Sequence, residues 1–143
     1  VPSGTPLTRD MLISVLYNMD GGSSGEPTFW AINNAIVPNI YASVLWGVDK
    51  PLTREQAAVI LYSYAKHVGC NVSQQANLTR YADYGQVRPA TRSAMAWAQA
   101  AGIITAPLPN ILSPQSTLTC EQANDILARF LVNAMGRTRL SRR

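Results

Sequence analysis

The sequence predicts an all-α fold assembled from a repeated helical unit, and two recurring phrases carry that prediction. The first phrase contains a threonine that opens a run with apolar residues at helical spacing, and it occurs three times, as Pro6–Asp10, Pro51–Gln56 and Thr117–Gln122. The second phrase is a Trp-Ala pair ahead of two aliphatic residues, and it occurs at Trp30 and Trp97. Because both tryptophans precede the next repeated threonine by nearly the same interval, the unit is a Trp-Ala helix, a loop and a threonine-capped helix.

Composition narrows the class of protein. Apolar residues make up 47% of the 143 residues and charged residues only 14%, which indicates a folded globular chain. No apolar run approaches the ~20 residues that a membrane-spanning helix needs, so we expect no membrane insertion. The net charge is +4, and the tail at residues 137–143 carries four arginines. Since the body is then close to neutral, we predict a solvated basic tail and no nucleic-acid binding. The alternative for the tail is electrostatic attraction to an anionic wall or membrane.

The first capped helix is predicted to run from Arg9 to about Met19, within a segment, residues 5–20, that has no Trp-Ala helix before it. Thr8 is a good N-cap, because its hydroxyl can accept a hydrogen bond from an N–H of the first turn. The glycine-serine run at residues 21–25 ends the helix and links it to the next element.

The second unit spans residues 26–69. A short helix is expected from Thr28 to Ile36, because Pro38 cannot continue it. Thr53 and Gln56 then have the spacing of a capping box, in which each side chain bonds the backbone N–H of the other residue. The helix that they begin is expected to end near residue 69, a glycine.

The third unit spans residues 78–135. Its Trp-Ala helix is expected from Thr91 to Ala101, and Thr119 with Gln122 forms a second capping box ahead of a helix that reaches about Met135. Aligned on their threonines, the three capped helices carry aliphatic side chains at matching positions, which predicts one common core. These side chains are Val15, Ile60 and Ile126, followed by Leu16, Leu61 and Leu127.

The Trp-Ala phrase, the run Leu52–Gln56 (Leu-Thr-Arg-Glu-Gln) and the triplet Tyr81-Ala82-Asp83 together resemble the S-layer homology (SLH) domain family. The resemblance covers about residues 5–132. It implies one domain, here residues 1–136, in which a pseudo-threefold array is built on a central three-helix bundle with shorter flanking helices and long loops. It also implies an extracellular module on the bacterial cell surface.

The same resemblance implies a non-catalytic function, the binding of secondary cell-wall polysaccharide. In that family the ligand is often an acidic, pyruvylated glycan whose carboxylate meets the arginine of the Thr-Arg phrase. Residue by residue, the resemblance assigns ligand binding to Arg9 and Arg54 and matches Asp83 to the acid of the opening triplet. Cys120 stands where the third arginine would be, so we expect the third site to be silent for acidic glycan.

Two departures from the family pattern leave an alternative function open. The first unit lacks its Trp-Ala half, and the second lacks the aromatic-x-Asp triplet. In the alternative, the chain is a degenerate SLH-like module that no longer binds glycan. It then mediates association between proteins, including a homo-oligomer in which another copy completes the first unit.

The candidate ligand-binding residues also have alternative roles. Arg9 and Arg54 lie in the first turn of their helices, where the helix dipole disfavours a cation. A guanidinium there suits a carboxylate, and the alternative is a salt bridge to an acid of a neighbouring unit. Trp46 falls in a predicted loop, where it can stack on a sugar ring. Asp83 can instead close its own turn.

Nothing in the sequence has the pattern of a catalytic or metal site. Three of the eight acids stand at helix starts, where a carboxylate stabilises the positive end of the helix dipole. They are Asp10, Glu55 and Glu121. His67 is the single histidine, and Cys70 and Cys120, which we expect as free thiols, are too few for a zinc site. We therefore predict neither an enzyme nor a bound cofactor.

Overall fold

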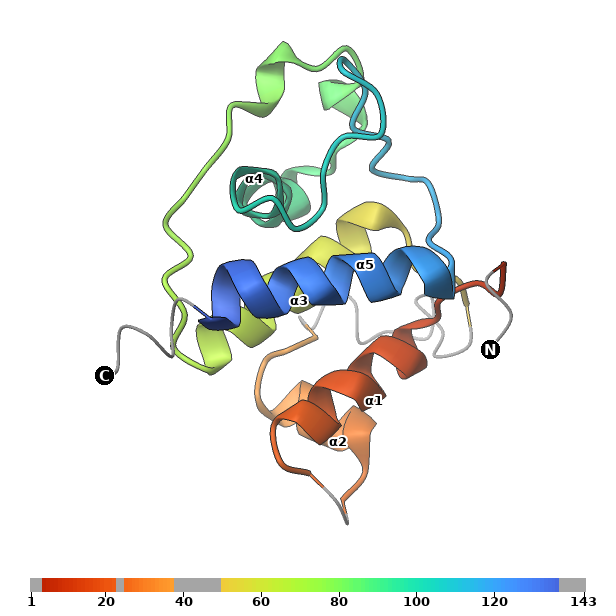
Figure 1. Ribbon diagram of the computed structural model, residues 1–143, viewed down its shortest axis with the longest axis vertical. Helices are drawn as coiled ribbons and strands as arrows, with labels where there is room; N and C mark the ends of the chain where they lie inside the picture. The colour runs from red at the N-terminus through yellow and green to blue at the C-terminus, as the bar shows by residue number, and fades with distance from the viewer. Residues whose placement is uncertain (1–3, 23–24, 38–49, 137–143) are drawn as a thin grey trace.

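The computed structural model describes residues 4–22, 25–37 and 50–136, and its regular elements are helices (Figure 1). The α-helices are α1 (Arg9–Met19), α2 (Pro27–Asn33), α3 (Arg54–His67), α4 (Arg92–Ala100) and α5 (Cys120–Phe130). Short 3₁₀ turns η3 (Leu78–Arg80), η4 (Tyr84–Gln86) and η5 (Pro89–Thr91) precede α4, and a π-helical turn η6 (Leu131–Met135) extends α5. The described residues contain isolated β-bridges but no strand. The prediction of an all-α protein is confirmed.

The capped helices begin at the predicted threonines. The hydroxyl of Thr8 accepts a hydrogen bond from the backbone N–H of Met11. Thr53 and Thr119 each form the full capping box with a glutamine three residues on. Each cap satisfies a first-turn donor that the helix itself cannot pair, and therefore fixes where α1, α3 and α5 begin.

Helices α2 and α4 end in the same hydrogen-bonding motif, and in α2 this motif ends the helix earlier than predicted. At α4, the N–H of Ile103 donates to the carbonyl of Ala98 and the N–H of Gly102 to that of Gln99, which is a Schellman motif around a residue with positive φ. At α2 the residue with positive φ is Ala35, at 56°, and Ile36 donates to Ala31. This closure ends α2 at Asn33, earlier than the predicted Ile36.

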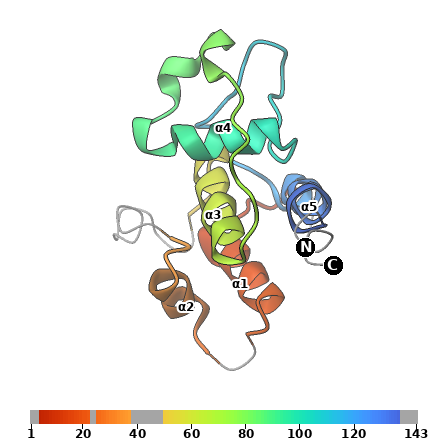
Figure 2. The ribbon, with the colours of Figure 1, turned by 90° about the vertical axis from the view of Figure 1, so that its left-hand side faces the viewer.

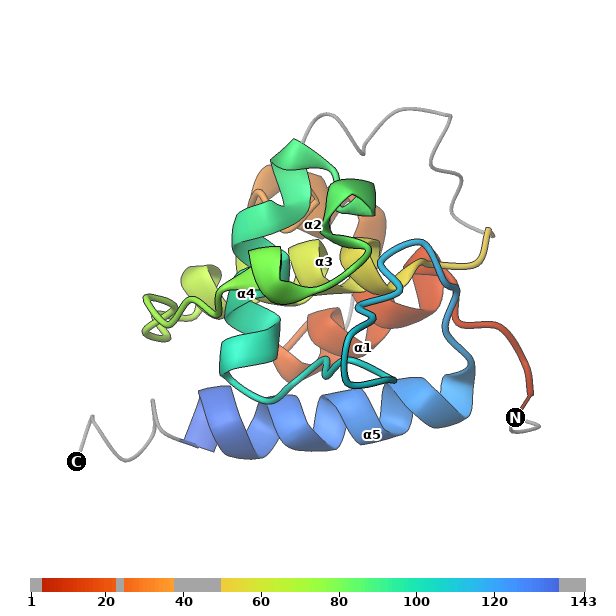
Figure 3. The same cartoon turned by 90° about the horizontal axis from the view of Figure 1, so that it is seen from above.

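A closed ring of three backbone hydrogen bonds joins the starts of the three capped helices. The N–H of Leu7 donates to the carbonyl of Leu118 at 2.8 Å, that of Leu118 to Leu52 at 3.0 Å, and that of Leu52 to Leu7 at 2.8 Å. Each leucine directly precedes a cap threonine, and each is buried. Figures 1 and 3 show the first turns of α1, α3 and α5 converging on the same side of the molecule.

The first Trp-Ala helix, α2, packs on α1 and α3 through its tryptophan. The ring centroid of Trp30 lies 5.6 Å from that of Tyr17 on α1 and 6.1 Å from that of Tyr64 on α3. Its indole N–H also donates to Asp20, just beyond α1, at 3.1 Å. Trp30 is half-buried, so it acts as a wedge at the edge of the core.

The second Trp-Ala helix, α4, repeats that packing one helix further along. The ring centroid of Trp97 lies 5.5 Å from that of Tyr62 on α3 and 6.4 Å from that of Phe130 on α5. Tyr62 follows its cap threonine by the same interval as Tyr17, and Phe130 by the same interval as Tyr64. Figure 2 shows α4 crossing α3, with its first turn on one side and its last turn toward α5.

The predicted common core holds at five of the six aligned positions. Leu16, Ile60 and Leu61 are fully buried, Ile126 is buried and joins the same cluster, and Leu127 packs against it. The prediction is wrong for Val15, which is 39% exposed. Val15 lines a groove between α1 and α5, and no described helix fills that groove.

Ala35 offers a direct test of the helix-end geometry. Ala35→Gly is expected to raise the free energy of unfolding by about 1 kcal/mol, because the left-handed region costs a residue with a Cβ roughly 1–2 kcal/mol. Gly21 has a φ of 88° and open space where a Cβ would lie, so Gly21→Ala should lower stability by a similar amount through backbone strain alone. Urea denaturation measures both. Equal stability of the two variants and the parent would contradict the assignment.

Candidate functional site

The loop between α4 and α5, residues 101–119, is fastened by an arginine in the first turn of α3. The Nε of Arg54 donates to the carbonyl of Leu112 at 3.1 Å, and its Nη2 donates to the carbonyl of Thr105. The cap at Thr53 places Arg54 at this end of α3, and the side chain is half-buried against the loop. The guanidinium group of Arg54 thus holds two separated parts of the loop, at residues 105 and 112.

Asp83 fastens the same loop by accepting hydrogen bonds from its backbone, whereas Arg54 donates them. Its Oδ1 accepts from the N–H of Leu112 and its Oδ2 from the N–H of Ser113, each at 2.8 Å. Ser113 has a φ of 53°, an uncommon conformation for a residue other than glycine. The paired N–H donors hold the backbone in that conformation. Asp83 therefore closes a turn of the α4–α5 loop, across 30 residues of sequence, rather than its own turn.

Glu55 forms a buried polar cluster beside Arg54. It is 1% exposed and accepts hydrogen bonds from the side-chain amide of Gln115 at 3.0 Å and the backbone N–H of Arg88 at 3.3 Å. The Nε of Arg88 also lies 3.5 Å from its carboxylate. The sequence suggested only a helix-start acid here. Its partners lie 33 and 60 residues further along the chain, so no local pattern could reveal them.

A second arginine, which no sequence motif indicates, lies near Arg54. Arg129, in the last turn of α5, donates from Nε to the carbonyl of Ile103 at 3.1 Å. Burial lowers the pKa of Arg54, and the positive charge of Arg129 lowers it further. In sequence, Arg129 looks like an ordinary cation at a helix C-terminus, a placement that the dipole favours. Only the tertiary fold brings it to the α4–α5 loop.

The two guanidinium groups, hereafter the Arg54–Arg129 pair, have no acidic partner among the described residues. Close contacts there between basic and acidic side chains join His67 to Asp20 at 3.4 Å and Arg88 to Glu55 at 3.5 Å. Both members of the Arg54–Arg129 pair are half-buried, and each uses part of its set of donors on carbonyls of the loop. Arginine has five N–H donors, so donors remain for a planar anion such as a carboxylate.

The other predicted ligand-binding residues lie elsewhere. Arg9 occupies the position in α1 that Arg54 occupies in α3, but it is only 6% exposed, and burial lowers the pKa of its guanidinium more than Asp10 raises it. Trp46 lies outside the described residues. At the third matching position, the sulfur of Cys120 lies 3.8 Å from that of Met11, in a largely apolar environment.

The described part of the chain lacks the features of several other chemistries. Residues 4–22, 25–37 and 50–136 contain no group of three histidine, cysteine or acidic side chains placed to hold a metal ion. Within the same ranges, every helix falls short of the length and apolar character needed to cross a bilayer. Cys70 and Cys120 are both free. No family model matches the chain, and neither a curated protein nor a solved structure matches it.

The contacts of Asp83 predict a specific loss of stability. Asp83→Asn leaves one carbonyl oxygen to serve two N–H groups, so it should lower the free energy of unfolding by about 1.5–3 kcal/mol, the range for a hydrogen bond to a charged group. Asp125→Asn removes an exposed acid of α5 and should change stability by less than about 0.5 kcal/mol. Urea denaturation compares them, and equal effects would show that the loop does not depend on Asp83.

Proposed function

We propose that this chain is an SLH-like module that binds an acidic polysaccharide of the bacterial cell wall and has no catalytic activity. The observation that carries the proposal is the Arg54–Arg129 pair, two guanidinium groups that donate to loop carbonyls only two residues apart and have no carboxylate partner among the described residues. A carboxylate on a sugar would offset these positive charges and accept hydrogen bonds from the guanidinium donors that the loop does not use.

The proposed SLH-like arrangement has support from the packing. The ring of hydrogen bonds links equivalent leucines of three capped helices, and each bond runs between corresponding atoms. Trp30 and Trp97 then make the same pair of contacts on successive capped helices. These relations are those expected of a pseudo-threefold array around α1, α3 and α5.

Within this proposal, each candidate residue has a distinct role. The Arg54–Arg129 pair binds the carboxylate, and Asp83 keeps the carbonyl groups of the α4–α5 loop aimed at the arginines. Trp46 remains a proposed stacking residue. Arg9 exposes little surface, so we assign it a weaker second site. Cys120 has no guanidinium, and its apolar surroundings support a silent third site.

The proposal places the chain outside the cell, at the bacterial surface, because that is where such polysaccharides occur. The absence of catalysis is supported by the engagement of Glu55, the most buried acid of the described residues, whose carboxylate accepts from three separate donors. Nucleic acid is not a proposed ligand, since the exposed charge of the body is close to neutral.

One observation favours the alternative function, a module that associates with proteins and does not bind glycan. Both arginines of the pair already donate to the chain's own carbonyl groups, as purely structural arginines do. The two functions make different predictions for Arg129. A structural arginine matters for stability alone, whereas a ligand-binding arginine also determines affinity in a folded variant.

The direct test is binding to purified cell-wall sacculi with and without their secondary polymer, followed by calorimetry on the polymer. Arg129→Ala should weaken binding by about 10- to 100-fold, corresponding to the 1.5–3 kcal/mol of one hydrogen bond to a charged group. Arg54→Lys keeps the charge but loses the planar fork, and should also weaken binding.

Lys66→Ala is the matched control for these variants. It removes the same charge from the other end of α3, about 18 Å from Arg54 at 1.5 Å per residue, and should leave affinity unchanged. Thermal unfolding confirms that each variant is folded. Binding that is independent of the polymer, or an equal affinity of Arg129→Ala and Lys66→Ala, would refute the proposed site.

A further inference from the structure

The packing of the Trp-Ala helices defines a third position that the described helices leave uncovered. Helix α2 lies against α1 and α3, and α4 lies against α3 and α5. The hydrogen-bond ring relates α5 to α1 in the same way. Counted from the cap threonines, the residues that would receive a third tryptophan there are Ala128 on α5 and Met19 on α1, and both are exposed.

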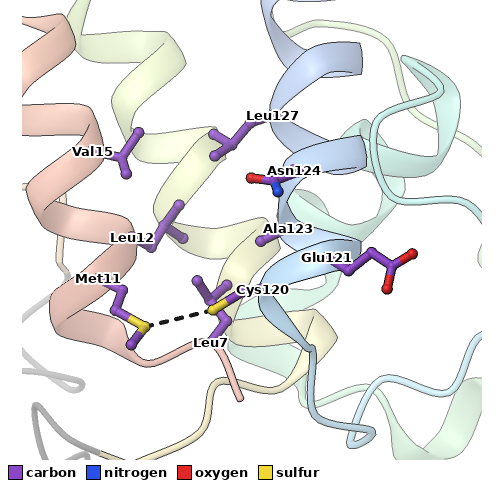
Figure 4. Close-up of a pocket in the computed structure, with 9 residues that line it drawn as sticks. All are labelled: Leu7, Met11, Leu12, Val15, Cys120, Glu121, Ala123, Asn124 and Leu127. Atoms are coloured by element: carbon purple, nitrogen blue, oxygen red, sulfur yellow. Dashed lines mark hydrogen bonds between the residues drawn. The ribbon is translucent and has the colours of Figure 1, made fainter. Parts of the chain in front are cut away.

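A groove of about 430 Å³ lies between α1 and α5. Figure 4 shows Met11 and Val15 on α1 facing Cys120 and Leu127 on α5 across it. Met11 is 38% exposed and Val15 39%, whereas the residue matching Val15 in α3, Ile60, is fully covered. The groove is therefore an apolar surface with the composition of a helix–helix interface and no covering helix among the described residues.

Glu121, at one edge of the groove, indicates the direction and the charged residues of a helix that would cover the groove. Glu121 occupies the position in α5 that Glu55 occupies in α3. Glu55 is held by the segment just before α4, through Arg88 and the hydroxyl of Thr91. Glu121 is exposed, and Figure 4 shows its carboxylate pointing away from α1. The first turn of α4 likewise lies on the side of α3 away from α5 (Figure 2).

We propose that the α1–α5 groove docks a short helix of the α4 type, supplied by a partner protein. The partner helix carries a tryptophan among small residues, and an arginine and a hydroxyl residue before its first turn to meet Glu121. A second copy of this chain fits less well, because its two Trp-Ala helices already pack in their own positions through Trp30 and Trp97. This proposal does not depend on glycan binding.

The test uses the full chain and a synthetic peptide with the sequence of residues 88–104. Cys120 lines the groove, so its alkylation by iodoacetamide, followed by mass spectrometry, reports occupancy. At a peptide concentration ten times the dissociation constant, mass action predicts alkylation about tenfold slower. A peptide with Trp97→Ala should give no protection.

Two protein variants locate the effect. Val15→Glu places a charge in the groove at an already exposed position and should abolish protection of Cys120. Leu108→Glu makes the same kind of change at a site that is 59% exposed in the α4–α5 loop, and should leave protection intact. Circular dichroism checks that both variants are folded.

Two results would overturn the proposal. One is alkylation of Cys120 at the same rate with and without peptide in the folded parent chain. The other is a concentration-dependent dimer, seen by sedimentation, that Val15→Glu dissolves and the peptide does not, because the groove would then be occupied by a second copy.

Discussion

The ring of hydrogen bonds among Leu7, Leu52 and Leu118 is the constraint on which the remaining structure depends. Three segments that are far apart in the sequence pair at one point, and each bond satisfies a buried backbone donor that would otherwise lack a partner. Since a cap threonine directly follows each leucine, the ring also fixes the origin and direction of α1, α3 and α5. The Trp-Ala helices then pack against helices whose relative register is already set.

The candidate site follows from that register. The backbone N–H groups of Arg54 and Cys120, which follow two of the cap threonines, donate to Ser116 and Thr5 of neighbouring connections. The side chain of Arg54 therefore reaches the loop that leads into α5. The same loop meets Asp83 from one side and Arg129 from the other, which gathers two positive charges and orders the backbone between them. The proposed binding surface thus lies where one repeated helix start meets a connecting loop, a region that contains many polar groups.

Local signals allowed much of the helical framework to be predicted from the sequence, and they identified Arg54 and Asp83 but not the residues around them. Thr53 with Gln56 is a capping box recognisable within four residues, and the start of α3 was correctly predicted. The burial of Glu55 and the approach of Arg129 depend on partners contributed by distant segments, so no periodicity contains them. The early end of α2 was missed because Ala35 has a positive φ, and helix ends of this kind usually have a glycine at that position.

Amide hydrogen exchange of Leu7, Leu52 and Leu118, followed by NMR, tests the central role of the ring most directly. If the ring joins the three capped helices into one cooperative unit, the three amides open together, with similar opening free energies close to that of global unfolding. Rapid exchange of the Leu7 amide, with Leu52 and Leu118 still protected, would contradict this account, because α1 would then be a separately opening element.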